Sequence, residues 1–149
     1  KTPELMHLAD CAMAVSGSVS LELLYHATPT VILYHVGRFG YQVQKFFRKV
    51  KYITLVNLLS TGRLYTGDIE PFDPAQPDAE QVLFPEYLTC EDKSAQLAGH
   101  VVEWLAQPEK RAARIEQLKN LRADVAHGGA SSRAAEYILQ SLDVVQKKC

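Results

Sequence analysis

The fold is decided by residues 12–34, which read AMAVSGSVSLELLYHATPTVILY. A short apolar run at residues 12–15 leads into a turn of small residues at 16–18, and a helical pattern follows the turn. Residues 30–34 are rich in β-branched side chains and come directly after Pro29, which is typical of a buried strand. A strand, a turn, a helix and a second strand in so short a stretch form a βαβ unit. Because such a unit joins parallel strands, the sequence predicts an α/β fold with a parallel sheet.

The segments after residue 34 predict one more strand and four helices. A helix over residues 39–50 and a short strand over residues 52–55 come first. Residues 60–82 include an acidic, proline-rich stretch, which predicts an exposed loop. Helices are expected over residues 92–105, over 109–125 and from 131 or 132 to 145. We therefore predict the distal part of a doubly wound α/β domain, closed by C-terminal helices.

The composition argues against several classes of protein. The chain has 149 residues, 47% of them hydrophobic, and its net charge of −1 is too small for a dedicated nucleic-acid binder. Its apolar runs are far shorter than the ~20 residues that a membrane span needs. Cys11, Cys90 and Cys149 fit neither a disulfide framework nor a zinc pattern, and no histidine has ligand spacing, so we expect reduced thiols and no metal. The opening residues lack a helix start signal, so we expect a piece of a longer protein.

Charge is unevenly distributed along the chain. Residues 23–67 contain six basic side chains and no acid, whereas residues 68–92 contain eight acids and no base. A basic stretch of this kind could face an anionic phosphate or a membrane surface, or it could form a solvated helix face. The apolar side of residues 38–51 is expected to pack on the sheet rather than on lipid, because any helix that covers a sheet needs such a side.

The turn at residues 16–22 is the first candidate site. It joins a predicted strand to a predicted helix, where unpaired N–H groups and the positive end of the helix dipole can hold a diphosphate. Gly17 would let the backbone approach closely, and the hydroxyls of Ser16, Ser18 and Ser20 could add donors. Glu22 lies one turn into the helix, where its carboxylate can accept hydrogen bonds from ribose hydroxyls. The alternative is a capped turn in which Glu22 only favours the first helical turn.

Asn57 is the second candidate. It directly follows the predicted third strand, so it could bind a sugar or a phosphate, or it could simply form a turn. No residue offers a convincing general base, and no pairing of a nucleophile with a histidine can be argued.

Several short segments occur in a characteristic order. They are Ala9-Asp10, SGSVSLE at 16–22, Thr28-Pro29, VILY at 31–34, KVKYI at 49–53, NLL at 57–59, FPEYL at 84–88 and GASSRAAE at 129–136. In this order and spacing they resemble the lipid-A-disaccharide synthases, a family of GT-B glycosyltransferases. The resemblance covers nearly the whole chain except about residues 60–82. Two positions depart from the family's pattern: His35 stands where an arginine is usual, and Val56 replaces the proline before Asn57.

The resemblance implies that residues 1–149 are part of a GT-B C-terminal domain, in which a Rossmann-like parallel sheet binds a UDP-sugar donor. It also implies a role for each candidate residue. The diphosphate of UDP would be held by Ser16, Gly17, Ser18 and Ser20, the ribose by Glu22, and Asn57 would help to position the donor.

The reaction that the resemblance implies transfers 2,3-diacylglucosamine from UDP-2,3-diacylglucosamine to 2,3-diacylglucosamine 1-phosphate, with inversion at the anomeric carbon. Family members need no metal cofactor, and they work in the cytoplasm, peripheral to the surface of the inner membrane. Their catalytic base belongs to an N-terminal domain. The resemblance therefore implies that this chain holds no catalytic residue and is inactive as a transferase on its own.

Two other interpretations stay open. Another GT-B enzyme that uses UDP-GlcNAc, such as the peptidoglycan GlcNAc transferase or a 2-epimerase, shares the small-residue turn and the glutamate after it. Such enzymes do not share the closing segment at residues 129–136. The chain could also be a non-catalytic nucleotide-binding module, because fold does not fix function.

Overall fold

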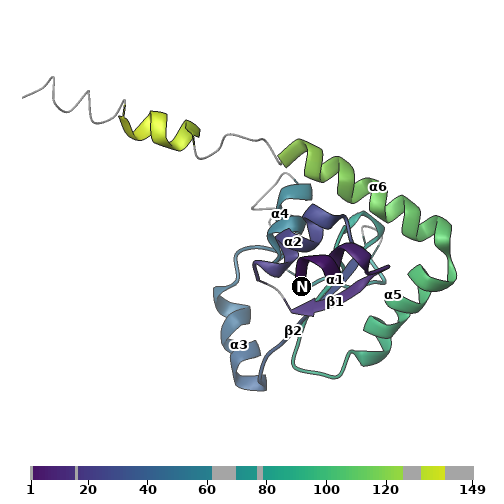
Figure 1. Ribbon diagram of the computed structural model, residues 1–149. Coiled ribbons are helices and arrows are strands. Elements are labelled where there is room, and N and C mark those ends of the chain that lie inside the picture. The colour runs from purple at the N-terminus through teal and green to yellow at the C-terminus, as the bar shows by residue number, and fades with distance from the viewer. Residues whose placement is uncertain (1, 16, 62–69, 77–78, 126–131, 140–149) are drawn as a thin grey trace, which may run out of the picture.

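The sheet of this protein has three parallel strands. The computed structural model describes all residues except 1, 16, 62–69, 77–78, 126–131 and 140–149. The strands β1 (Ala12–Val15), β2 (Thr30–His35) and β3 (Glu86–Thr89) lie in the order β1-β2-β3 (Figure 1). Val15 is opposite Leu33, and His35 is opposite Thr89, so the three strands end at the same edge of the sheet. The predicted α/β fold with a parallel sheet is confirmed.

Six helices flank the sheet in the described part of the chain. They are α1 (Thr2–Leu8), α2 (Val19–His26), α3 (Arg38–Phe47), α4 (Leu55–Thr61), α5 (Ser94–Ala106) and α6 (Pro108–Val125), with a short 3-10 helix at Ala79–Gln81. Residues 132–139 are also helical, which confirms that much of the expected last helix. The rest of that prediction lies outside the described residues. No described helix has both the length and the apolar character that spanning a bilayer requires.

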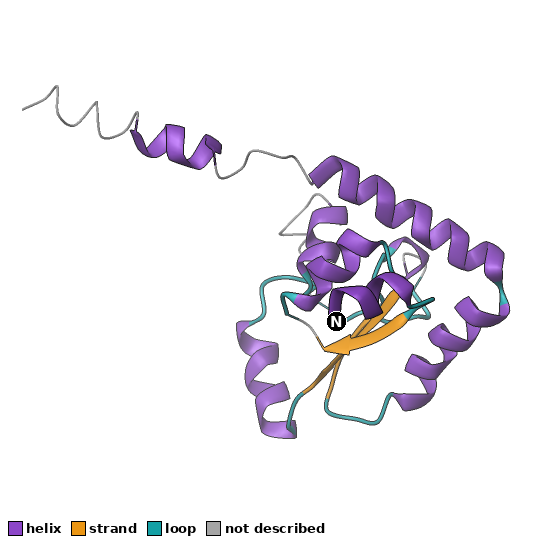
Figure 2. Ribbon diagram, in the orientation of Figure 1, coloured by secondary structure: helices purple, strands orange, loops and turns teal. Residues whose placement is uncertain are grey.

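Two hydrophobic cores lie on opposite faces of the sheet. The strand β2 contributes side chains to both cores, since Ile32 points into one core and Val31 into the other. Figure 2 shows helices on both sides of the strands. The first core contains Met6, Leu23, Leu24, Ala27, Ile32, Val56, Leu83, Phe84, Leu118 and Leu121. The second contains Val31, Tyr52, Phe72, Val82, Tyr87, Leu97 and Trp104. Burial of both faces explains why β2 is almost continuously apolar.

The predicted strand over residues 52–55 is wrong. Residues 52 and 53 lie outside regular structure, α4 begins at Leu55, and the third strand is β3 instead. The N–H groups of Ile53 and Thr54 donate to the side chain of Glu86, so they are not available to a strand ladder. Tyr52 is buried in the second core, and its burial explains the apolar, strand-like pattern.

Two further expectations are corrected by burial. No residue of α3 is buried, so the apolar side of this helix does not pack on the sheet as expected. The acidic, proline-rich loop is not wholly exposed, because Phe72 is buried and its ring meets Tyr87 edge-on at 5.4 Å. Of the cysteines, Cys11 and Cys90 lie in the described part and are free.

Candidate functional site at the carboxyl edge of the sheet

The turn after β1 has a conformation that favours glycine. Gly17 has a φ of 149°, in the range that residues with a Cβ rarely adopt. Ser20 stabilises the turn with two hydrogen bonds. Its hydroxyl donates to the Gly17 carbonyl oxygen at 2.8 Å, and its backbone N–H donates to the same oxygen at 3.1 Å. Ser20 is 1% exposed. Ser16 lies outside the described residues.

The helix α2 presents its N-terminus and Glu22 at this edge. Ser18 is the N-cap residue, and its side chain makes no capping hydrogen bond. Leu23 and Leu24 are buried in the first core, which leaves the neighbouring Glu22 exposed in the first turn. The N–H groups of Ser20 and Leu21 donate to the carbonyl oxygens of Gly17 and Ser18, so an anion here would be held by the N–H groups that precede them, at the positive end of the dipole. This end of α2 is therefore suited to an anion such as a diphosphate.

Asn57 lies inside the molecule, in the buried side of α4. Its exposed fraction is 1%. The side-chain amide donates to the Phe84 carbonyl oxygen at 2.7 Å and to Glu86 Oε2 at 3.1 Å, and Asn57 Oδ1 accepts the N–H of Phe84 at 3.0 Å. These bonds join α4 to the segment that enters β3. The structure therefore does not place Asn57 beside the turn at residues 17–22 as an exposed side chain that could bind a ligand.

Glu86 is a buried side chain that joins parts of the fold and that the sequence analysis does not predict. It is buried at the start of β3, and its two carboxylate oxygens accept four hydrogen bonds. The donors are the N–H groups of Ile53 and Thr54, the Thr54 hydroxyl and the Asn57 amide. A single acid within the apolar run from Val82 to Leu88 is the signal that could have revealed it, because buried carboxylates require several donors.

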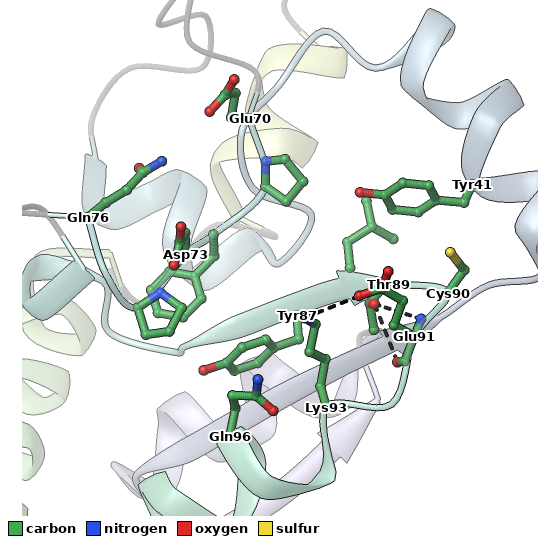
Figure 3. A pocket seen from close by; sticks show the side chains of 14 residues that line it. Tyr41, Glu70, Asp73, Gln76, Tyr87, Thr89, Cys90, Glu91, Lys93 and Gln96 are labelled. Atoms are coloured by element: carbon green, nitrogen blue, oxygen red, sulfur yellow. Dashed lines mark hydrogen bonds and ion pairs between the residues drawn. The ribbon is translucent and has the colours of Figure 1, made fainter.

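A cavity of about 400 Å³ lies at the carboxyl end of β3 (Figure 3). The ring of Tyr41 enters it from α3, and Thr89 and Glu91 line it where β3 ends. Glu70 and Asp73 lie across from them on the described part of the acidic loop. Glu70, Asp73 and Glu91 belong to the acidic stretch at residues 68–92, but that stretch does not by itself predict a cavity, because Tyr41 reaches the cavity from α3. Its acidic lining makes it a poor site for a diphosphate, in contrast to the N-terminus of α2.

Burial perturbs two titratable groups beside this cavity. Burial raises the pKa of Tyr87 to about 12, and the negative charge of Asp73 adds to the effect. Burial also lowers the pKa of His100, whose Nε2 lies 2.8 Å from the Tyr87 hydroxyl. Both groups are therefore held neutral at neutral pH, which suits a packing role better than proton transfer.

The end of β2 carries one exposed titratable group, His35. The pKa of Asp92 is lowered, mainly because Asp92 accepts hydrogen bonds from Ser94, and the charge of His35 contributes. No group of three potential ligands that could hold a metal ion occurs among the described residues.

The carboxyl ends of the three strands thus bring together features that are far apart in the sequence. The turn at residues 17–22 follows β1, His35 ends β2, and the acidic cavity follows β3. In open α/β sheets, ligands bind outside the carboxyl ends of the strands. This edge is therefore the candidate site.

Comparison with known proteins shows which family this chain resembles in sequence. Residues 1–70 match the family model described as Lipid-A-disaccharide synthetase. The chain is 27% identical to the lipid-A-disaccharide synthase of Syntrophus aciditrophicus, over 98% of this chain and 32% of that protein. It is 28% identical to that of Trichlorobacter lovleyi, over 94% of this chain and 32% of that protein. The chain is similar to the lipid-A-disaccharide synthases. The resemblance predicted from the sequence is confirmed.

The lipid-A-disaccharide synthase of Myxococcus xanthus gives the same result, with 27% identity over 95% of this chain and 32% of that protein. The chain thus spans about a third of the length of the curated lipid-A-disaccharide synthases it matches, and the matched part is their C-terminal portion. No solved structure matches the chain. The residues matched by the family model include the turn at residues 17–22, His35 and Asn57.

Proposed function

We propose that this chain is the donor-binding part of a lipid-A-disaccharide synthase. In this proposal the whole protein is a hexosyltransferase with a GT-B C-terminal domain that includes residues 1–149. It moves 2,3-diacylglucosamine from its UDP-linked form to 2,3-diacylglucosamine 1-phosphate, with inversion. The protein would act in the cytoplasm, peripheral to the inner membrane. The similarity to synthases over nearly the whole chain supports the family, and the turn after β1 supports the donor role.

The observation that carries the proposal is the turn from Gly17 to Ser18 at the N-terminus of α2. It lies at the carboxyl edge of the sheet, and its glycine lets the backbone come close to a ligand. We assign the diphosphate to the backbone N–H groups of Ser16, Gly17 and Ser18 and to the hydroxyls of the two serines. Ser20 would act by holding the turn, since its hydroxyl already donates to the Gly17 carbonyl oxygen.

Glu22 and Asn57 have different roles in this proposal. The exposed carboxylate of Glu22 would accept hydrogen bonds from the ribose hydroxyls. Asn57 would position the donor indirectly, because its amide is occupied by Phe84 and Glu86. It would do so by fixing α4 against β3.

The positive end of α2 would stabilise the departing UDP, a task that a metal ion performs in other enzymes. The base that activates the acceptor hydroxyl is assigned to another part of the whole protein. The 149-residue chain is therefore expected to have no transferase activity. Turnover of UDP-2,3-diacylglucosamine by the chain alone would contradict this assignment.

The test is binding of UDP to the chain, followed by chemical-shift perturbation in NMR and by calorimetry, with and without Mg²⁺. We expect metal-independent shifts at residues 17–22. Glu22→Ala should weaken binding by about 1–3 kcal/mol, which is the scale of hydrogen bonds to a charged group. Glu109→Ala is the matched control, since Glu109 is also an exposed glutamate in the first turn of a helix, α6.

The outcomes separate the proposal from its alternatives. Unchanged affinity in Glu22→Ala would remove Glu22 from the site, and shifts confined to the acidic cavity would move the site to β3. Binding of UDP-GlcNAc equal to that of the diacylated donor, in the whole protein, would favour another GT-B enzyme that uses UDP-GlcNAc.

A further inference from the structure

The helix α3 is oriented with its polar side toward the body of the protein. Tyr41 and Gln44 are half-buried: Tyr41 reaches the acidic cavity, and Gln44 lines a groove near β2. Phe39, Val43 and Phe46 lie on the opposite side of the helix, because residues four and seven apart share a face. A helix that covers a hydrophobic core shows the reverse orientation.

The outward side of α3 exposes three phenylalanines. Phe39, Phe46 and Phe47 are 83%, 86% and 78% exposed. A fully buried phenylalanine gains roughly 1.5–3 kcal/mol relative to an exposed one, so this arrangement forgoes several kcal/mol within the chain itself. Contiguous exposed apolar patches of this kind mark surfaces that bind something else. In Figure 1, α3 lies apart from the other labelled helices.

An apolar groove of about 470 Å³ continues this surface. Phe47 and Val50 line it on the side of α3, Leu58 lines it from α4, and Leu88 from β3. The phenylalanines and the groove together form one apolar surface, which we call the α3 surface.

Positive charge borders the α3 surface. Arg38, Lys45 and Lys49 are exposed on or next to the helix. Residues 23–67 contain no acid, so no carboxylate from this stretch offsets these charges. In the described part of the chain, the acidic side chains that share a cavity with α3 are Glu70, Asp73 and Glu91, and α3 meets this cavity through Tyr41, on the side opposite Phe39 and Phe46.

We propose that the α3 surface binds an anionic lipid bilayer, with the phenylalanines inserted at the interface and the basic side chains against the lipid phosphates. Basic residues beside exposed aromatic residues on an amphipathic helix have the chemistry that an anionic membrane surface attracts. A second copy of this chain is disfavoured, because a two-fold contact through α3 would bring like charges together. The inference deepens the proposed function by naming the element that contacts the membrane, and it is tested separately from UDP binding.

The experiment is co-sedimentation of the 149-residue chain with vesicles. One set contains phosphatidylglycerol and phosphatidylcholine in a one-to-three ratio, and the other contains phosphatidylcholine alone. We expect binding to the anionic vesicles at about 0.1 M salt, at least ten-fold weaker binding to neutral ones, and clear weakening at about 0.5 M salt.

Two pairs of substitutions test the two components. Phe39→Ser with Phe46→Ser, and separately Lys45→Gln with Lys49→Gln, should each lower vesicle binding at least ten-fold. The matched control is Leu105→Ser, since Leu105 is 53% exposed on α5, away from α3. The control should bind vesicles like the wild type. All variants should keep the wild-type affinity for UDP, which shows that they are folded.

Absence of vesicle binding by the wild type would overturn the inference, and so would equal binding by all variants. A dimer in sedimentation velocity that is lost on Phe46→Ser would assign the surface to a second copy instead. Vesicle binding without UDP binding would overturn the proposed function and leave this inference standing.

Discussion

Replacing Glu86 with glutamine tests whether the carboxylate that joins β3 to α4 holds the candidate site in shape. The substitution keeps the shape of the side chain and replaces one acceptor oxygen with an NH₂ donor. In the structure, Oε2 accepts the Thr54 N–H at 3.0 Å, the Thr54 hydroxyl at 2.5 Å and the Asn57 amide at 3.1 Å, while Oε1 accepts the Ile53 N–H. Whichever way the new amide turns, its NH₂ group must face a donor.

The expected loss follows from these contacts. With the amide oxygen in the position of Oε2, the Ile53 N–H is left without an acceptor, which costs about 1–3 kcal/mol in a buried place. The three remaining bonds change from charge-assisted to neutral, and each weakens by roughly 1 kcal/mol. The smaller desolvation of the neutral side chain offsets part of this loss. We therefore expect Glu86→Gln to lower the free energy of unfolding by about 2–4 kcal/mol.

The assay is urea denaturation followed by the fluorescence of Trp104, which is the single tryptophan and is buried in the second core. Glu91→Gln is the control, because Glu91 is exposed and its ion pair with Lys93 is long, at 3.6 Å. It should change stability by less than about 0.5 kcal/mol. A loss below 0.5 kcal/mol in Glu86→Gln would refute the view that this carboxylate organises α4.

Three further predictions concern the turn after β1 and the half-buried His100. Gly17→Ala should cost about 1–3 kcal/mol from its φ of 149° alone, since nothing lies within 4 Å of the added Cβ. Gly99→Ala is the control, because Gly99 lies in open space on α5, and it should raise the free energy of unfolding by about 0.5–1 kcal/mol. A loss at Gly99 as large as the loss at Gly17 would show that the φ of Gly17 is not the cause. Ser20→Ala removes the hydrogen bond to the Gly17 carbonyl oxygen. It should lower the free energy of unfolding, measured by urea denaturation, by about 1 kcal/mol, and it should also weaken UDP binding. Unchanged affinity for UDP would show that the turn does not depend on this bond. Because burial lowers the pKa of His100, the unfolded chain binds more protons below its ordinary value of 6.5, so stability should fall as pH drops below that value. His100→Leu should flatten this pH dependence in urea titrations between pH 7 and 5.5, and an unchanged slope would exclude His100 as its cause.

Most of the fold follows from local patterns. The strands β1 and β2 and the helices α2, α5 and α6 lie within a few residues of their predicted positions, because each combines a strong period with a clear boundary signal. The failed strand at residues 52–55 has a non-local cause. Ile53 and Thr54 read as strand residues, but a carboxylate 32 or more positions further along the chain takes their N–H groups. The sequence around residues 52–55 therefore cannot show that these N–H groups bind Glu86.

The candidate site is only partly predictable for a similar reason. The turn at residues 16–22 is recognisable because its glycine, serines and glutamate are contiguous. The prediction that Asn57 binds a sugar or a phosphate, or forms a turn, rested on a strand that does not form. The bonds of Asn57 to Phe84 and Glu86 explain why an asparagine is needed at a buried position. The acids of the cavity are visible in the sequence as the acidic stretch at residues 68–92, but the cavity itself is not, because its walls also include Tyr41 of α3.

The position of α3 directly after β2 connects the proposal of membrane binding with the proposal of nucleotide binding. This helix begins three residues after His35, and β1 ends beside β2 at the same edge of the sheet. A bilayer held by Phe39 and Phe46 would therefore lie near the edge where the turn after β1 would hold a nucleotide. Nucleotides are soluble, whereas the acyl chains of the proposed donor are not, so a donor bound at this edge would need lipid nearby. If the α3 surface binds vesicles, weakening it should raise the KM of the whole enzyme for a diacylated donor while leaving the affinity of UDP itself unchanged.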